Sequence, residues 1–506
     1  MATVTGEHMT KPKRQKVFID RIPTGVPGLD HILSGGLPKN QIYLVQGDPG
    51  AGKTTFALQF LLEGLRANQP ALYVTFSESR RELEEVAASH GWDIAKMAMF
   101  DLSATESLFR LEAQNTVFHS SEIELTETTQ ALLRVIEESN PTRLAIDSVS
   151  ELRLLAGSDL RFRRQLLFLK TYLAQRGVTV LLVDDLADKE RSHTLQSLAH
   201  GVVGLERLTP EFGANRRRLS VLKLRGSSFI EGYHNYAIRS GGIVVFPRVS
   251  AAAERRKIEP NLLSSGLPAL DALLKGGLDA GTSALLVGPA GCGKSSVAMQ
   301  FVHAAAHRGE RVSVFLFDEN LHSYHLRARG MNLALDEGVF AEHISVQQID
   351  PAEMSIGEFA HIIYSQVDAG VSIVVIDSLN GYLQASPGER HITLHLHELL
   401  SYLSQHGVLT ITTLAQQGMV GSTPSQIDVT YLADTVLLLR YFEWSGCIHK
   451  ALSVFKRRGG PHENTIRELK LTAEGVKIGE PLTHLRGVMS GIPEPLGGPG
   501  QALQSS

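Results

Sequence analysis

Two glycine-rich segments of the chain share the spacing G-x-x-x-x-G-K-[ST]. Such a loop needs glycines because its backbone N–H groups must curl around phosphates, at a helix N-terminus whose dipole already favours anions. The lysine then reaches the β- and γ-phosphates of a nucleotide, and the hydroxyl residue after it is a ligand for Mg²⁺. A chance glycine-rich turn explains one such match far better than it explains two. The predicted ATP-binding residues are Gly47, Asp48, Pro49, Gly50, Ala51, Gly52, Lys53, Thr54 and Thr55 in the first segment, and Gly288, Pro289, Ala290, Gly291, Cys292, Gly293, Lys294, Ser295 and Ser296 in the second.

Two aspartates at the ends of apolar runs complete the predicted metal sites. Asp147 ends the run RLAID, and Asp377 ends the run IVVID. A strand of this kind delivers the second acidic group of a P-loop site, which holds Mg²⁺ through water. An aspartate at a strand end is weak support alone, but here it recurs at the same relative place in both halves. We therefore predict Mg²⁺ ligands at Thr54, Asp147, Ser295 and Asp377.

Carboxylates that follow the second predicted strand of each half are candidates for the catalytic step. Glu78 lies in FSES and Glu319 in FDEN, where Asp318 gives the second half an additional acid. A carboxylate at that strand end would face the γ-phosphate and orient or deprotonate the attacking water. A solvated loop acid is the alternative interpretation. The first half therefore carries one predicted catalytic carboxylate, and the second half carries two.

Cysteine is rare in this chain, which contains Cys292 and Cys447. Two cysteines cannot form a disulfide framework, and their number fits a protein of the reducing cytoplasm. Cys292 lies inside the second glycine-rich loop at a helix start, where the helix dipole is expected to lower the pKa of its thiol. A small residue tolerated in a turn is the alternative interpretation of Cys292.

The two glycine-rich loops belong to a long internal repeat. The segment from Thr24 to Thr55 reappears from Ser265 to Ser296 at an offset of 241 residues. The strand-ending aspartates are 230 residues apart, so the first half has 11 additional residues before its aspartate. We expect this insertion within the irregular stretch 101–124. The chain is thus predicted to contain two copies of one domain.

The limits of the two copies follow from changes in composition. The stretch RVSAAAERRKIEP, residues 248–260, lacks an apolar pattern. The chain after residue 486 is rich in glycine and proline, and such a segment buries too little surface to repay its ordering entropy. The predicted organisation is a flexible arm over 1–18, a first ATPase domain over 19–250, a linker over 251–260, a second ATPase domain over 261–486 and a flexible tail over 487–506.

Short apolar runs alternate with helical patterns within each copy. In the first copy the runs 42–46, 71–76 and 178–185 are largely apolar, which is typical of parallel strands covered by helices on both faces. Right-handed crossovers then produce an open sheet, and ligands bind at the carboxyl edge of such a sheet. The predicted fold class is therefore α/β, with an open, mostly parallel sheet in each domain.

The charge balance excludes some classes of protein. The 506 residues include 49 Lys and Arg against 53 Asp and Glu, which gives a net charge of −4. This balance disfavours a dedicated nucleic-acid binder, because such proteins attract phosphate with a basic surface. The sequence shows no apolar run of membrane-spanning length and no apolar signal segment, so we expect a soluble, cytoplasmic protein without a membrane partner.

Further motifs point to a family. Each copy opens with G-x-x-x-L-D, at 25–30 and 266–271, contains I-D-S and ends with K-x-R-G. With these motifs the chain resembles the KaiC family of bacterial clock ATPases in the RecA superfamily, from Ile22 to Leu485. The resemblance implies tandem RecA-like P-loop domains in a two-tiered homohexameric ring, with ATP between neighbouring subunits, and a signalling or circadian output through clock protein partners. Cations supplied by the neighbour would stabilise charge on the transferring phosphoryl group. The resemblance assigns this role to Lys223, Arg225, Lys456 and Arg458.

The resemblance also implies Ser/Thr autokinase activity in the second domain, on two adjacent hydroxyl residues. The corresponding residues here are Thr430 and Tyr431, with Ser425 as a further upstream position. Tyr431 departs from the family pattern, because its longer, rigid side chain presents its oxygen at a different place. Thr430 is the predicted phosphoacceptor. The alternative is that the pair simply leads into the following strand.

Two other functions stay open as alternatives. A RecA-like DNA-dependent ATPase of the recombinase or helicase type would need a basic and aromatic strip to stack single strands, and none is evident. An ATP-gated assembly scaffold would use nucleotide to control assembly and partner docking, with slow turnover.

Overall fold

The computed structural model describes residues 20–102, 120–185, 189–248, 259–333, 335–384, 392–416 and 429–496. The predicted arm 1–18 lies outside these residues, as do most of the predicted linker 251–260 and most of the stretch 101–124. The chain divides into two compact units. The first comprises Met1–Leu208 and Arg217–Pro247, and the second comprises Thr209–Arg216 and Arg248–Ser506.

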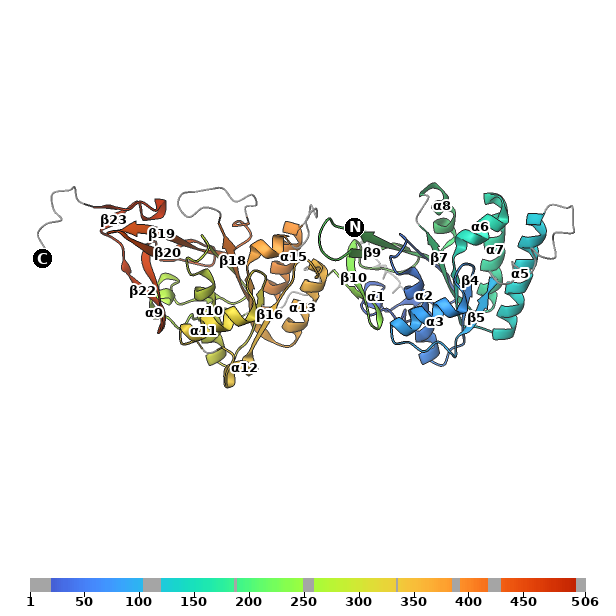
Figure 1. Ribbon diagram of the computed structural model, residues 1–506, viewed down its shortest axis with the longest axis horizontal. Helices are drawn as coiled ribbons and strands as arrows, with labels where there is room; N and C mark the ends of the chain where they lie inside the picture. The colour runs from blue at the N-terminus through green and yellow to red at the C-terminus, as the bar shows by residue number, and fades with distance from the viewer. Residues whose placement is uncertain are drawn as a thin grey trace, which may run out of the picture. The chain divides into compact units, whose positions relative to one another are not determined.

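The first unit is built on a nine-stranded sheet of order β11-β10-β9-β8-β3-β7-β6-β4-β5 (Figure 1). The pairs from β8 to β5 are parallel, and β9, β10 and β11 pair antiparallel at the other end. The strands are β3 Ile42–Gly47, β4 Ala71–Thr75, β5 Ala98–Asp101, β6 Arg143–Asp147, β7 Thr179–Asp185, β8 Gly201–Leu208, β9 Arg216–Leu224, β10 Tyr233–Arg239 and β11 Gly242–Phe246, with a separate pair β1 Arg21–Ile22 and β2 Leu37–Pro38. The helices are α1 Leu29–Ile32, α2 Lys53–Arg66, α3 Arg80–Ser89, α5 Ser120–Ser139, α6 Val149–Ala156, α7 Asp159–Gln175 and α8 Lys189–Leu198.

The second unit repeats this plan in a nine-stranded sheet of order β16-β15-β17-β18-β14-β19-β20-β21-β22. Its strands are β14 Ser283–Gly288, β15 Arg311–Leu316, β16 Ile344–Gln348, β17 Val371–Asp377, β18 Leu409–Ala415, β19 Thr435–Trp444, β20 Cys447–Arg457, β21 Arg467–Thr472 and β22 Gly475–Pro481, with the short pairs β12 Leu262–Leu263 and β13 Leu278–Asp279, and β23 Leu485–Arg486 and β24 Glu494–Pro495. The helices are α9 Pro268–Leu273, α10 Lys294–His307, α11 Leu321–Gly330, α12 Val339–His343, α13 Ile356–Asp368, α14 Leu379–Gln384 and α15 Ile392–Gln405, followed by the 3-10 turn Val488–Ser490.

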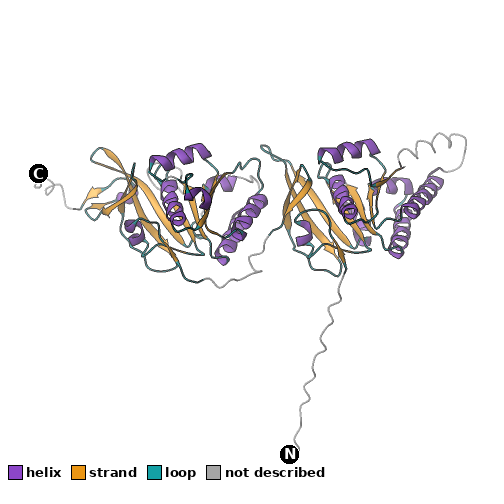
Figure 2. Cartoon of the chain, turned by 90° about the horizontal axis from the view of Figure 1, so that it is seen from below, coloured by secondary structure: helices purple, strands orange, loops and turns teal. Residues whose placement is uncertain are grey.

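Helices cover both faces of the parallel part of each sheet, as Figure 2 shows. In β3, Tyr43 and Val45 belong to the core under α2, whereas Ile42 and Leu44 belong to the core under α7. Strands that are apolar on both faces therefore follow from two covered faces. The predicted class, two tandem α/β P-loop domains with open, mostly parallel sheets, is confirmed. None of the described helices is long and apolar enough to cross a membrane.

Strand pairing locates the length difference between the two halves. In the first half, Leu72 of β4 pairs with Ala98 of β5 and with Leu144 of β6. In the second half, Ser313 of β15 pairs in the same way with Ser345 of β16 and with Val374 of β17. The offset between the halves is 241 residues at β4 and β15, 247 at β5 and β16, and 230 at β6 and β17. The second half is therefore longer by 6 residues between the first two of these strands, and the first half is longer by 17 between the last two. The predicted 11-residue insertion is thus the net of two differences.

Residues 487–496, the start of the predicted flexible tail, make tertiary contacts in the second unit. Val488 is buried and packs with Phe442, Ala451 and Leu485, and β24 pairs with β23. These apolar contacts give the segment up to residue 496 an ordered fold, because the buried surface offsets the entropy that composition alone suggested it could not repay. Residues 497–506 lie outside the described part of the chain.

Candidate nucleotide-binding sites

The first glycine-rich loop joins β3 to α2 at the carboxyl edge of the first sheet. Gly50 and Gly52 have φ angles of +73° and +94°, a conformation that favours glycine. A Cβ atom on Gly50 would lie 2.7 Å from Nη1 of Arg207, and one on Gly52 would lie 2.6 Å from Cδ1 of Ile238. The positive φ angles therefore favour glycine at these positions, whereas the two neighbouring atoms are ends of flexible side chains that could shift.

The second loop joins β14 to α10 in the same way. Gly291 and Gly293 have φ angles of +76° and +108°. Here a Cβ atom on Gly291 would lie 2.8 Å from the hydroxyl of Tyr441, and one on Gly293 would lie 3.1 Å from Cδ2 of Leu469. The two loops thus share their conformation, although the side chains above them differ.

The loop lysines point back at the loop carbonyls. Nζ of Lys53 donates to the carbonyls of Gly47 and Asp48, both at 3.0 Å, and lies 2.7 Å from Oδ1 of Asp185. The ammonium group therefore sits where a phosphate oxygen would compete for it.

Lys294 makes the same backbone contacts. Its Nζ donates to the carbonyls of Gly288 and Pro289 at 2.8 and 2.7 Å. Burial lowers the pKa of Lys294 from its usual value, and Asp377 acts in the opposite direction.

Oxygen atoms converge beside the first loop. The hydroxyl of Thr54 donates to Oδ2 of Asp147 at 2.9 Å and lies 3.5 Å from Oε1 of Glu78. Tyr73 donates its hydroxyl to the same Asp147 oxygen at 2.7 Å. The structure therefore brings together the hydroxyl and the two carboxylates that sequence analysis assigns to one site.

The two carboxylates of this cluster have pKa values above their usual range. Burial, followed by the charge of Asp147, raises the pKa of Glu78 to about 7, and burial also raises the pKa of Asp147. Oε2 of Glu78 is buried and has no hydrogen-bond partner among the described residues. A site made only of oxygen donors, with one carboxylate oxygen unpaired, fits Mg²⁺, which prefers oxygen ligands.

The corresponding groups of the second site are arranged differently. Thr413 donates to Oδ1 of Asp377 at 2.5 Å, and Ser378 donates to Oδ2 of Asp318. The peptide bond after each strand-ending aspartate, 147–148 and 377–378, is cis. Asp318 follows the end of β15, and Asp377 ends the adjacent strand β17, so both acids lie at the edge of the sheet that carries the loop.

Glu319 is held by an arginine that sequence analysis missed. Nη1 of Arg327 lies 2.9 Å from Oε1 of Glu319, and Nη2 lies 2.7 Å from Oε2. Burial raises the pKa of Glu319, while Arg327 acts to lower it. In the first half the equivalent position, 241 residues earlier, is Val86, so Glu78 has no such clamp from that helix.

Cys292 is buried in the second loop, and burial raises the pKa of its thiol despite the nearby Lys294. The expected lowering by the helix dipole is therefore wrong, because desolvation of the thiolate outweighs it. The first loop has Ala51 at this position, which supports the interpretation of a small residue tolerated in a turn.

The K-x-R pairs hold equivalent segments in the two units. Lys223 donates to the carbonyl of Gln196 at 2.6 Å, and Arg225 donates to that of Ser197 at 2.9 Å. Ser197 lies in the last turn of α8, whose carbonyls attract cations. Both acceptors thus belong to α8, and neither belongs to the glycine-rich loop of the same unit.

In the second unit the corresponding K-x-R residues, Lys456 and Arg458, hold the segment that contains the predicted phosphoacceptor. Lys456 donates to the carbonyls of Thr430 and Ala433 at 3.1 and 2.7 Å, and Arg458 donates to that of Tyr431 at 2.8 Å. Gly201 pairs with Tyr43 as Thr435 pairs with Ala284, which sets an offset of 234 residues here, so Thr430 corresponds to Gln196 and Tyr431 to Ser197. The upstream candidate, Ser425, lies outside the described residues.

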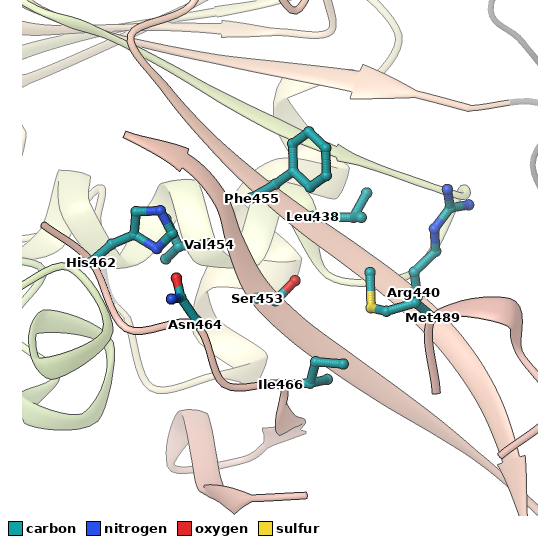
Figure 3. Close-up of a pocket in the computed structure, with 9 residues that line it drawn as sticks. All are labelled: Leu438, Arg440, Ser453, Val454, Phe455, His462, Asn464, Ile466 and Met489. Atoms are coloured by element: carbon teal, nitrogen blue, oxygen red, sulfur yellow. The ribbon is translucent and has the colours of Figure 1, made fainter. Parts of the chain in front are cut away.

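A pocket of about 370 Å³ lies on β19 and β20, near the strand end that carries Lys456 (Figure 3). In Figure 3, His462 and Asn464 lie at one side of Ser453, and Arg440 and Met489 lie at the other. No predicted nucleotide-binding residue lines it. The lining residues are Leu438, Arg440, Ser453, Val454, Phe455, His462, Asn464, Ile466 and Met489.

Comparison with known proteins gives a consistent result. The sequence model of the family described as "ATPase: KaiC" matches residues 22–250 and 263–483. The circadian clock oscillator protein KaiC of Thermostichus vulcanus is 28% identical over 500 residues, which cover 96% of this chain and 94% of that protein. The protein of the same name from Synechococcus elongatus is 28% identical over 509 residues, covering 97% and 95%.

Proposed function

The chain belongs to the KaiC family of ATPases, and we propose that both of its P-loops bind ATP with Mg²⁺ and hydrolyse it. The observation that carries the proposal is the convergence of the Thr54 hydroxyl, Asp147 and Glu78 beside the first loop. The second loop has the same backbone contacts from Lys294. Each unit therefore offers a phosphate cradle with acids near it, and in the first unit the hydroxyl of Thr54 contacts those acids.

In this proposal Lys53 and Lys294 bind the β- and γ-phosphates, and the backbone N–H groups of each loop hold the phosphate chain. Thr54 and Ser295 would hold Mg²⁺ directly, with Asp147 and Asp377 holding it through water. The metal supplies charge neutralisation on the phosphate oxygens. Glu78 and Glu319 with Asp318 orient the attacking water and accept its proton.

Phosphate release by Glu78→Gln combined with Glu319→Gln tests this mechanism. Each amide keeps the shape of the side chain but cannot accept a proton, so we expect turnover to fall about 100-fold at the first site and about tenfold at the second, where Asp318 remains. Glu84→Gln is the matched control, because Glu84 lies on the exposed face of α3 and pairs with Arg80. Unchanged turnover in the double variant would exclude the assigned role. Unchanged nucleotide-dependent assembly with abolished turnover would instead favour the assembly scaffold.

We further propose a homohexameric ring in which ATP lies between subunits and the K-x-R cations reach the neighbour's nucleotide. The exposure of Arg458 supports this, because 54% of its side chain remains accessible to a neighbouring subunit while it contacts Asp434. Subunit mixing tests it. Protein with Lys53→Ala and Lys294→Ala is inactive alone, as is protein with Arg225→Ala and Arg458→Ala. A mixture of the two regains turnover if the cations act in trans, and stays inactive if they act within one chain.

Autokinase activity on Thr430 is a further proposal, supported by the Lys456 contact that fixes the backbone of this residue. Labelled ATP and mapping of the incorporated phosphate test it. Thr430→Ala should abolish labelling, whereas Ser197→Ala, which removes a hydroxyl from the equivalent segment of the first unit, should not. Absence of labelling in the parent protein would remove the kinase and leave the ATPase.

The relatives named above are circadian clock oscillator proteins, and we propose a signalling or timing output through protein partners in the cytoplasm. The near-neutral charge of −4 supports protein partners over nucleic acid. Single-stranded DNA should leave turnover unchanged. A large, salt-sensitive stimulation would favour the DNA-dependent ATPase.

A further inference from the structure

Asp185 is a carboxylate of the first site that the proposed mechanism does not use. It ends β7, and in the parallel register it pairs directly with Gly47, the first residue of the glycine-rich loop. Its Oδ1 lies 2.7 Å from Nζ of Lys53, whose side chain is 11% exposed. The lysine that must bind phosphate is therefore already paired with an acid.

The second site has the same register without the acid. Ala415 ends β18 and pairs with Gly288, just as Asp185 pairs with Gly47. Lys294 keeps the two carbonyl contacts of its counterpart. The repeat thus provides an internal comparison in which one methyl group replaces one carboxylate.

The neighbouring residue has a separate task. Asp184 is buried, accepts a hydrogen bond from Ser150 at 2.6 Å and lies 3.9 Å from Arg153. Asp185 faces the other way and keeps 46% of its side chain exposed. Its charge is therefore directed at the loop and not at the structural pair behind it.

We propose that Asp185 is a specificity-determining residue of the first nucleotide site, which competes with the terminal phosphate for Lys53 and disfavours ATP relative to ADP. This inference rests on the proposed function. A bound phosphate must break the ion pair, and the released carboxylate then lies beside the phosphate chain. Like-charge repulsion grows with phosphate charge, so ATP loses more affinity than ADP.

The test uses the full chain with one site silenced. In a Lys294→Ala background, binding of fluorescent ATP and ADP analogues reports the first site. Asp185→Asn keeps the size of the side chain and removes its charge. We expect affinity to rise about tenfold for ATP and about threefold for ADP, in the range of a partly exposed charge pair at close quarters. High salt should shrink both gains.

The matched variant moves the acid to the other site. In a Lys53→Ala background, Ala415→Asp should weaken ATP binding more than ADP binding. Melting curves without nucleotide establish that both variants fold. An unchanged ratio of ATP to ADP affinity in Asp185→Asn overturns the inference while leaving the proposed function intact. Failure of the Lys294→Ala parent to bind either nucleotide would refute the proposed function at the first site itself.

Discussion

The loops around Lys53 and Lys294 follow the same course, but the side chains at the two sheet edges differ. At the first edge, Asp185 pairs with Lys53, and Glu78 lies near Thr54 with one oxygen unpaired among the described residues. At the second edge an alanine replaces the aspartate, and Arg327 clamps the glutamate. The duplication has thus kept the backbone cradle and changed the charges around it. Each half therefore serves as the natural control for the other.

The loop lysines should give the largest effect. Lys53→Ala removes the charge that binds phosphate at the first site, and Lys294→Ala does so at the second. We expect each to lower nucleotide affinity about 100-fold at its own site, because charge-assisted hydrogen bonds to phosphate are lost. Titration calorimetry should resolve one remaining binding event per chain in each single variant. Loss of both events from one substitution would show that the sites are not independent.

The two catalytic glutamates should differ in effect. Glu78→Gln, measured in the Lys294→Ala background, should reduce phosphate release about 100-fold, because Glu78 already faces the metal-binding hydroxyl. Glu319→Gln in the Lys53→Ala background should cost about tenfold, since Asp318 remains and Arg327 holds Glu319. Equal losses at both sites would contradict the importance of the arginine clamp.

The pKa of Glu78 gives a smaller, pH-dependent effect on the protein without nucleotide or metal. Its usual value of 4.5 is raised to about 7, so between these pH values the folded state binds more protons than the unfolded state. Stability of the first unit therefore falls as pH rises through this window. Glu78→Gln mimics the protonated acid and should melt about 1–3 °C above the parent at pH 8, and together with it at pH 4. Equal melting temperatures at pH 8 would contradict the raised pKa.

Cys292 should give the smallest effect. Cys292→Ala installs the residue that the first loop has at this position, Ala51. Because the thiol is buried and its pKa is raised, we expect less than about a twofold change in nucleotide affinity and slow alkylation of the parent thiol. Rapid alkylation that ATP prevents would restore the interpretation of an activated cysteine.

The sequence predicted what depends on local pattern. The glycines, the loop lysines and the apolar strands have spacings that are visible without a structure, and the repeat aligned them. The ion pair of Lys53 with Asp185 was not predictable, since it depends on the register of β3 and β7. The Arg327 clamp requires knowing where α11 begins, and the ordered segment around Val488 requires knowing which apolar partners it meets.

The separation of the hydrophobic cores has a consequence for measurement. Among the described residues, each core cluster draws its members from one unit alone. A ligand that binds one loop stabilises the unit that contains it, by an amount set by its concentration relative to its dissociation constant. We therefore expect calorimetric melting to show a separate transition for each unit. A shift confined to one transition would identify which of the two loops is occupied, without a label on either.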